Sequence, residues 1–199
     1  EGFRLHQEWE RKLADARYSV VSWPQEYGGR GASLIEWVIF EEEYYRAGAP
    51  GRVSQNGIFL LAPTLFEHAH PEQLARIMPR MARADDIWGQ AWSEPEAGSD
   101  LASLRSTAKK VDGGWLVTGQ KVWTSGAHNA DFAILLARTD TSVPKHAGMT
   151  YFLVDMTDPG VEVRPLRQIT GEAEFNEVFL SGVRVPDRNR VGKVGEVWR

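Results

Sequence analysis

Two segments of the sequence combine a large aromatic residue with small hydroxyl residues where a strand is expected to end. The first segment is residues 88–100, WGQAWSEPEAGSD, and the second is residues 119–127, GQKVWTSGA. An aromatic face can stack on a flat ring, while hydroxyl and backbone N–H groups can bind the polar edge of that ring. The alternative is a plain strand–turn boundary with a half-buried tryptophan, and composition alone favours this alternative.

Other catalytic arrangements find little support in the sequence. The five histidines include no pair at helical spacing with a carboxylate beside it, and His68 and His70 are expected on different helix faces, so no metal site is predicted. The sequence contains no cysteine, which excludes disulfides, zinc thiolates and a cysteine nucleophile. It also lacks a GxSxG elbow, a P-loop and a GxGxxG fingerprint. A nucleotide cofactor would therefore be bound without the familiar glycine motif.

The first half of the sequence, which precedes both segments, is expected to be helical. Apolar residues recur at helical spacing over residues 3–17, and Ser33 with Glu36 forms a capping box ahead of another apolar run. A further helix is expected over residues 55–66, perturbed by Pro63. Pro71 is placed to open a helix that Pro79 is expected to bend or end.

The second half of the sequence has the pattern of short strands. Runs rich in Val, Ile, Thr, Phe and Trp alternate with Gly, Pro and Asp turns, at residues 115–122, 132–137, 150–155, 161–166 and 177–185. Strands of this length and spacing are typical of a small barrel or sandwich. We therefore predict an α+β protein, with an N-terminal all-α domain at residues 1–87 and a β-barrel-like middle domain at residues 88–199.

The composition limits which binding partners and which cellular compartment are expected for this protein. The net charge is −4, from 23 basic and 27 acidic residues, and no basic block indicates nucleic-acid binding. No apolar stretch approaches the roughly 20 residues of a membrane span, and no signal peptide is visible. The sequence begins with Glu1 rather than Met, so we interpret it as part of a longer chain. The expected location is the cytoplasm, or the mitochondrial matrix if a targeting segment has been lost.

At these two segments the sequence resembles the acyl-CoA dehydrogenase family. Residues 93–100, SEPEAGSD, are similar to the family signature around EPxAGSD, and residues 119–125, GQKVWTS, resemble its second flavin segment, GxKxWITN. Three further stretches agree in the same order, namely WPQEYGG at 23–29, TYFLV at 150–154 followed by PGV at 159–161, and FNEVFLSGVRVP at 175–186. Each motif alone is weak, but five in order over nearly the whole sequence are specific.

The resemblance implies a role for each matching residue. The residues expected to contact FAD are Gln90, Trp92, Ser93, Trp123, Thr124 and Ser125. Within this set, the tryptophan of the second segment would pack on the flavin, and the serine that follows Thr124 would bond the flavin N5. Ser99 matches a position near the acyl-CoA thioester. Serines replace the family's usual threonines at two of these positions, and Gln90 stands where an aromatic is common, which puts substrate preference in doubt.

The same resemblance implies the reaction and what this sequence leaves out. The expected activity is FAD-dependent α,β-dehydrogenation of an acyl-CoA thioester to the trans-2-enoyl-CoA, with an electron-transfer flavoprotein as acceptor and a homotetramer or homodimer as assembly. The family's catalytic base is a glutamate in a C-terminal helical bundle, and the sequence is expected to be truncated before that bundle. Glu94 and Asp100 are therefore interpreted as loop-structuring carboxylates rather than as the base.

Three alternatives stay open at this point. An acyl-CoA oxidase or a flavin monooxygenase relative would share the flavin loops, a degenerate partner subunit of a heteromeric dehydrogenase would lose the flavin, and a pure binding module ranks last. The aromatics Trp37, Tyr44 and Tyr45 on one expected helix either line a broad acyl pocket or pack in the core, and helical spacing favours packing.

Overall fold

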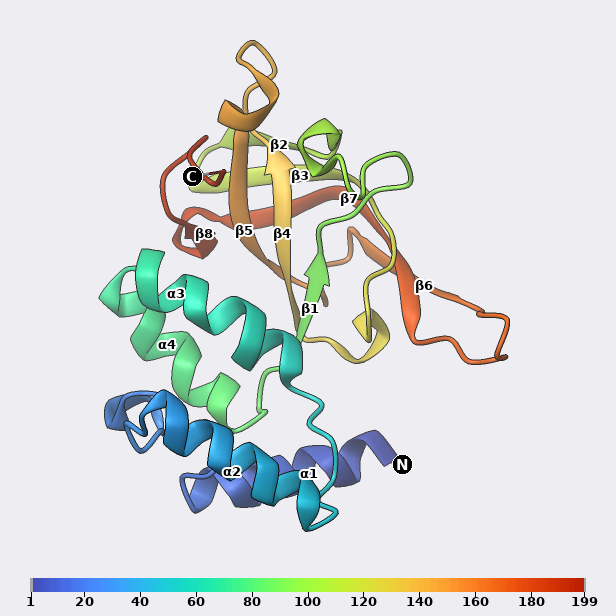
Figure 1. Ribbon diagram of the computed structural model, residues 1–199. Coiled ribbons are helices and arrows are strands. Elements are labelled where there is room, and N and C mark those ends of the chain that lie inside the picture. The colour runs from blue at the N-terminus through green and yellow to red at the C-terminus, as the bar shows by residue number, and fades with distance from the viewer. Residues whose placement is uncertain (1, 199) are drawn as a thin grey trace. The chain divides into compact units, whose positions relative to one another are not determined.

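The computed structural model describes residues 2–198 of the 199-residue chain, and the chain divides into two compact units, Glu1–Ile87 and Trp88–Arg199. The first unit is helical and the second is built on a β-sheet (Figure 1). The predicted order, helices followed by a β domain, is therefore confirmed.

The described part of the helical unit contains four α-helices, and their ends follow local sequence signals. The expected capping box is present, because the Ser33 hydroxyl accepts a hydrogen bond from the Glu36 backbone N–H at 3.3 Å and the Glu36 carboxylate accepts one from the Ser33 backbone N–H at 2.8 Å. Pro71 occupies the first turn of the last helix, as predicted. The helices are α1 (Gly2–Asp15), α2 (Leu34–Arg46), α3 (Ala62–His68) and α4 (Pro71–Ala82).

The two internal prolines have different effects on the helical unit. The expected helix over residues 55–66 is instead a π-helical turn, η2 (Asn56–Leu61), followed by α3, whose first turn contains Pro63. A proline lacks the N–H and its ring clashes with the carbonyl four residues earlier, so a wider turn replaces regular helix here. Pro79 does not end α4, which continues to Ala82. Pro79 and Ala75 both lie at exposed positions, so the carbonyl that Pro79 cannot bond faces water.

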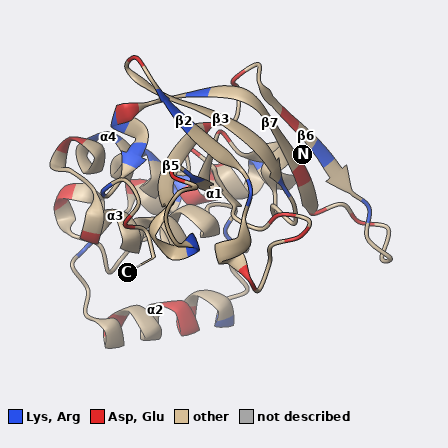
Figure 2. Ribbon diagram, turned by 90° about the horizontal axis from the view of Figure 1, so that it is seen from above, with Lys and Arg blue, Asp and Glu red and all other residues tan. Residues whose placement is uncertain are grey.

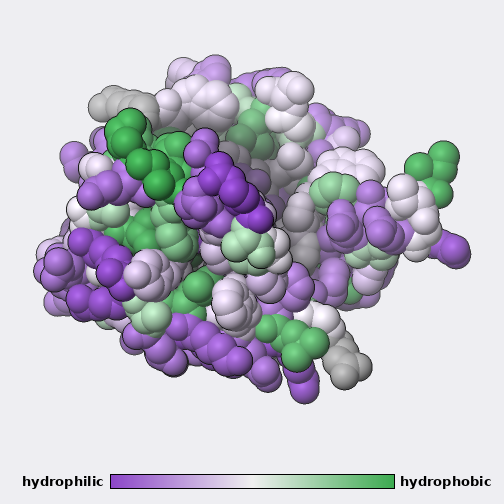
Figure 3. Space-filling model, turned by 60° about the horizontal axis from the view of Figure 1, so that its bottom comes forward, coloured by the Kyte–Doolittle hydropathy of each residue, from purple (hydrophilic) through white to green (hydrophobic). Residues whose placement is uncertain are grey.

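Helix α2 presents both charged and apolar residues to the surface. Figure 2 shows acidic residues along this helix and a basic residue, Arg46, at its C-terminal end. Hydrophobic side chains also reach the surface of the protein, as the green areas in Figure 3 show. On α2 the exposed apolar side chains are those of Leu34, Ile35, Val38 and Ile39.

No helix among the described residues is long and apolar enough to cross a membrane.

The β unit is an eight-stranded sheet with the order β6-β7-β3-β2-β4-β5-β8, and β1 pairs in parallel with β4. Its longest strand forms antiparallel pairs on both sides. Two short strands, at residues 107–111 and 190–191, were not predicted. The strands are β1 (Trp88–Ala91), β2 (Thr107–Val111), β3 (Gly114–Lys121), β4 (Phe132–Arg138), β5 (Met149–Asp155), β6 (Val161–Leu166), β7 (Phe175–Pro186) and β8 (Arg190–Val191).

Asp187 secures the hairpin between β2 and β3. The turn consists of Asp112 and Gly113, whose φ of +71° is left-handed and therefore suits glycine. The Asp187 carboxylate accepts hydrogen bonds from Lys110 Nζ at 2.7 Å and from Trp115 Nε1 at 2.8 Å. These two donors lower the pKa of Asp187 from 3.8 to about 2.

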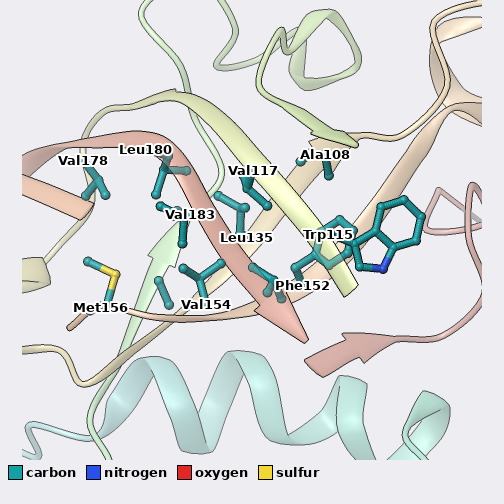
Figure 4. Packing of buried hydrophobic residues seen from close by; sticks show 14 of the residues in the cluster. Ala108, Trp115, Val117, Leu135, Phe152, Val154, Met156, Val178, Leu180 and Val183 are labelled. Atoms are coloured by element: carbon teal, nitrogen blue, oxygen red, sulfur yellow. The ribbon is translucent and has the colours of Figure 1, made fainter. Parts of the chain in front are cut away.

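The core of the β unit lies inside the curved sheet. Buried side chains from β3 and β7 meet side chains from β4 and β5 in one apolar cluster, which includes Val117, Leu135, Phe152 and Val183 (Figure 4). Strands that are separated in the sheet order can share a cluster only if the sheet bends around it. The barrel-like expectation is thus met by a strongly curved sheet, and its rigid core holds the loops that follow β1 and β3.

Candidate functional site

The two candidate segments meet where β1 and β3 end. The backbone N–H of Val122 donates a hydrogen bond to the carbonyl of Ser93 at 2.9 Å. The Lys121 ammonium donates to the carbonyl of Trp92 at 3.0 Å and to the carboxylate of Glu94 at 2.8 Å. The structure therefore brings the first segment and the second segment together, although 27 residues separate Glu94 from Lys121. We call the contact between residues 92–94 and residues 121–122 the segment junction.

Glu94 organises the loop that follows β1. Its carboxylate accepts hydrogen bonds from the backbone N–H groups of Arg105 at 2.5 Å and Ser106 at 2.9 Å, in addition to the one from Lys121. Its backbone pairs with Ala97 in both directions, which closes a tight turn. The prediction that Glu94 is a loop-structuring carboxylate is confirmed by these contacts.

The Glu94–Lys121 ion pair is buried, and burial shapes both pKa values. Burial acts to raise the pKa of Glu94, but the Lys121 ammonium and the N–H donors outweigh it, so the pKa of Glu94 lies below its ordinary value. Burial lowers the pKa of Lys121, whose side chain is fully buried, and the carboxylate of Glu94 opposes this shift. Each group supplies the other with a hydrogen-bonded counter-charge at 2.8 Å.

The second segment ends in an unusual backbone conformation at Trp123. Its φ is +61°, which is uncommon for a residue other than glycine, and 61% of the residue is exposed. The indole ring contacts Phe175 edge to face, with centroids 6.0 Å apart. A large aromatic face that is held at a strand end and open to solvent is available for stacking.

Thr124 and Asn176 fix the backbone on the far side of Trp123. The two residues exchange backbone hydrogen bonds at 3.0 and 3.1 Å, and the Asn176 side-chain amide donates to the Thr124 carbonyl at 2.9 Å. The Thr124 hydroxyl is buried and has no hydrogen-bond partner within the described part of the chain. A buried hydroxyl without a partner is costly unless a ligand or water completes it, so this atom is suited to contact a polar cofactor.

Of the remaining candidate side chains, only that of Trp92 belongs to a residue of the segment junction. Trp92 packs edge to face on Tyr151, with centroids 6.3 Å apart, and its indole N–H is buried without a partner. Burial also raises the pKa of Tyr151. Gln90 is half-buried on β1, opposite Ile134 of β4, and Ser125 is exposed. Ser99 lies in the exposed turn before a short 3-10 helix and is held by none of the junction bonds described above.

Sequence reasoning assigned no role to two residues that build the site. Lys121 stands inside the quoted second motif, and a lysine at an inward-facing strand position was the available signal. Asn176 stands inside the FNEVF stretch, and nothing local to it indicates that it pairs with Thr124, which is 52 residues away. Among the described residues no cluster of His, Asp and Glu is placed to hold a metal ion.

Comparison with known proteins gives consistent matches over both units. Residues 1–85 match the model of the acyl-CoA dehydrogenase N-terminal domain, and residues 89–183 match the model of the acyl-CoA dehydrogenase middle domain. The acyl-CoA dehydrogenase FadE34 of Mycobacterium tuberculosis is 52% identical over 190 residues, covering 94% of this chain and 26% of the relative. The acyl-CoA dehydrogenase IpdE1 of the same organism is 46% identical, covering 100% of this chain and 52% of the relative.

Solved structures agree with this similarity. The Tcur3481-Tcur3483 steroid ACAD superposes with a TM-score of 0.87 at 32% identity, covering 96% of this chain and 49% of that chain. The ChsE4-ChsE5 complex from Mycobacterium tuberculosis gives a TM-score of 0.86 at 35% identity, covering 97% of this chain and 49% of that chain. The chain thus spans about half the length of each of these solved chains, as it does of IpdE1. With both of its units matched in sequence and in fold, the chain belongs to the acyl-CoA dehydrogenase family.

Proposed function

We propose that this chain forms the helical and flavin-binding parts of a protein that oxidises an acyl-CoA thioester to the trans-2-enoyl-CoA with FAD. The segment junction is the observation that carries the proposal. It ties the first segment to the second, which offers an open indole face at Trp123 and, next to it, a buried hydroxyl at Thr124 that has no hydrogen-bond partner among the described residues. A flat ring with a polar edge matches this combination of stacking surface and hydrogen-bonding atoms.

The proposed contacts with FAD follow from the position of each residue. Gln90, Trp92 and Ser93 would hold the edge of the flavin ring with backbone and side-chain groups, and Trp123 would cover its face and limit access of water. Thr124 and Ser125 would complete the set with their hydroxyls. When bound, FAD supplies the hydride acceptor, while the protein binds and orients the flavin and the substrate and supplies the electrostatic field around them.

Glu94 is unsuited to be the catalytic base. Its carboxylate already accepts three hydrogen bonds, and its pKa lies below the ordinary value. A general base needs a free lone pair within reach of the proton and a pKa near the working pH. We therefore propose that the base comes from another part of the whole protein or from a partner chain, and that Ser99 lies on the thioester side of the site.

The names of the relatives support a narrower substrate and assembly. One similar solved structure is a steroid ACAD, and another is a complex of two named components, ChsE4 and ChsE5. We propose that thioesters with a bulky polycyclic acyl group are the substrates to test first, and that the protein works as an oligomer of like or unlike chains. An electron-transfer flavoprotein is the proposed electron acceptor.

The test is anaerobic reduction of the flavin. The full-length protein with bound FAD is mixed without oxygen with straight-chain, branched and steroid-derived acyl-CoA thioesters, while the flavin absorbance near its visible maximum is followed. Bleaching by one class establishes the dehydrogenation half-reaction and identifies the substrate class. A flavin that stays oxidised with every thioester refutes the dehydrogenase proposal and favours a monooxygenase relative. Rapid reoxidation by air identifies an oxidase, and a protein without flavin is the degenerate partner subunit.

A further inference from the structure

The helical unit contains a cavity of its own, separate from the segment junction. Its volume is about 260 Å³, and all of its lining residues belong to Glu1–Ile87. Four aromatic side chains form much of its wall, namely Trp23, Trp37, Phe59 and Phe66. Trp37 stacks on Phe59 with centroids 6.0 Å apart, and Trp23 meets Phe66 edge to face at 5.4 Å. Of the three aromatics on α2 considered above, Trp37 thus lines a cavity, whereas Tyr44 is buried and Tyr45 is exposed.

Arg52 is one of the residues that line this aromatic cavity, and its guanidinium lies 4.9 Å from the ring centroid of Tyr44. Its side chain is only 2% exposed, and its Nη1 donates a hydrogen bond to the Glu41 carboxylate at 2.7 Å. Its Nε and Nη2 are buried and have no hydrogen-bond partner among the residues that the structure describes. These two nitrogens lie on one edge of the guanidinium, and that edge can donate two parallel hydrogen bonds to the two oxygens of a carboxylate.

A second polar group lines the same cavity. The hydroxyl of Ser19 is buried, and only 4% of the residue is exposed. Over residues 2–198 its Oγ has no hydrogen-bond partner. Buried donors are nearly always satisfied in native proteins, so two residues with unmet donors in one cavity indicate a missing acceptor. An apolar pocket with a few convergent polar groups is the usual form of a small-molecule site.

We propose that this cavity binds a small organic carboxylate with a flat, apolar body. The carboxylate sits on the Nε and Nη2 edge of Arg52, the Ser19 hydroxyl donates to one of its oxygens, and the body lies against the aromatic wall. The volume equals that of roughly eight or nine water molecules, which suits an acid of one or two rings. This proposal does not depend on the flavin reaction.

The neighbouring carboxylates explain why a ligand must contact the guanidinium of Arg52 directly. Glu41 already holds Nη1 of Arg52, and the buried Glu10 carboxylate accepts hydrogen bonds from the backbone of Val53 and Ser54. Arg52 therefore offers little long-range attraction for anions, because its charge is balanced nearby. Only a ligand that reaches the free edge of the guanidinium gains the two charge-assisted hydrogen bonds.

The probe for this site is 2-naphthoate, with the neutral 2-naphthamide as its matched control. Binding to the whole chain is measured by titration calorimetry and by chemical-shift changes of the tryptophan indole N–H groups, with no flavin or thioester present. We expect 2-naphthoate to bind at least tenfold more tightly than 2-naphthamide, because only the carboxylate accepts both hydrogen bonds of Arg52. Equal affinity for the two compounds, or no binding of 2-naphthoate at millimolar concentration, overturns the proposal.

Variants separate recognition from folding. Arg52→Gln is expected to weaken 2-naphthoate binding at least tenfold and to leave the binding of 2-naphthamide unchanged. Arg52→Lys keeps the positive charge but cannot donate two parallel hydrogen bonds, so its affinity for 2-naphthoate is expected to lie between those of the wild type and Arg52→Gln. Ser19→Ala leaves the Arg52–Glu41 pair in place and is expected to weaken binding two- to fivefold. Arg46→Gln, an exposed arginine of α2 outside the cavity, is the control and keeps wild-type affinity. Wild-type affinity in both Ser19→Ala and folded Arg52→Gln refutes the assigned contacts.

Discussion

The buried ion pair at the segment junction gives the sharpest stability prediction for this protein. Lys121 is fully buried and its ammonium has two acceptors, the Glu94 carboxylate and the Trp92 carbonyl. Replacing it by methionine keeps most of the volume but removes the counter-charge of Glu94. Removing one partner of a buried pair costs about 3–5 kcal/mol, because the other charge stays buried and uncompensated. We expect Lys121→Met to lower the stability of the β unit by that amount.

Glu94→Gln is expected to cost about as much, for a different reason. Three donors point at the Glu94 carboxylate, two from backbone N–H groups and one from Lys121. A glutamine has only one acceptor oxygen, so its amide N–H₂ would face one of these donors. Each buried donor left unsatisfied costs about 1–3 kcal/mol, and the lysine also loses its counter-charge.

The assay must report on the β unit alone, because a chain with two compact units need not unfold in one step. Amide signals of β3 and β4 in two-dimensional NMR, followed through a urea titration, provide that report. Lys109→Met removes an exposed lysine from β2 and serves as the control, with an expected change within about 0.5 kcal/mol. The double variant Lys121→Met/Glu94→Gln should cost about 1–3 kcal/mol less than the sum of the costs of the single variants Lys121→Met and Glu94→Gln.

Two results would refute this reasoning. If Lys121→Met changes the stability no more than Lys109→Met, the buried pair does not hold the junction. If the costs in the double variant are simply additive, the two residues act independently in spite of their 2.8 Å contact. The acid dependence gives a further check: because the pKa of Glu94 is lowered from 4.5, its contribution is present above about pH 4.5 and is lost as the pH falls through the lowered pKa. Glu94→Gln should remove this dependence.

Three further predictions concern other parts of the chain. Trp123→Ala should weaken FAD binding at least tenfold in a fluorescence titration, yet change unfolding by less than about 1 kcal/mol because the side chain is exposed; unchanged FAD affinity would remove this residue from the site. In the wild type, the free energy of unfolding of the β unit in urea should decrease as the pH falls from 3.8 to about 2, because Asp187 is protonated there. Asp187→Asn should remove this decrease, and an unchanged pH profile would contradict the lowered pKa of Asp187. Gly29→Ala should prevent native packing of the helical unit, because the added Cβ would lie 2.0 Å from a backbone oxygen, whereas Gly51→Ala meets open space and should leave the thermal midpoint almost unchanged; equal midpoints would show that the turn can relax.

Local signals in the sequence sufficed for the elements whose ends are set by a few neighbouring residues. The Ser33 capping box and the position of Pro71 depend on contacts within one helical turn, so both could be predicted. The π-helical turn at Asn56–Leu61 could not, because a broken helix and a widened turn share the same apolar pattern around Pro63. The strand Thr107–Val111 was missed since two adjacent lysines hide its alternation.

The candidate site shows the same division between local and distant information. Its residue types could be recognised because each motif lies in one continuous stretch, and the family resemblance added an expected role to each. The contact between Lys121 and Glu94, and the pairing of Thr124 with Asn176, join residues 27 and 52 positions apart. No pattern within a single stretch encodes such a distance. Thr124 and Asn176 meet because they continue the antiparallel pairing of β3 with β7, whereas Lys121 and Glu94 meet because the folded sheet brings the ends of β3 and β1 together. The roles of Gln90, Ser99 and Ser125 stay predictions.

The backbone at Trp123 links the stability of the β unit to its proposed function. A residue other than glycine with a φ of +61° costs about 1–3 kcal/mol and persists only where its surroundings impose it. Here one side is fixed by the Val122–Ser93 hydrogen bond and the buried ion pair next to it, and the other side by three hydrogen bonds between Thr124 and Asn176. The strained conformation therefore forms as the domain folds, before any ring is bound. It follows that weakening the hydrogen bonds on either side of Trp123 should lower the affinity for the cofactor, even where the weakened residues do not touch the cofactor. Part of the binding energy would then be needed to restore the backbone conformation at Trp123.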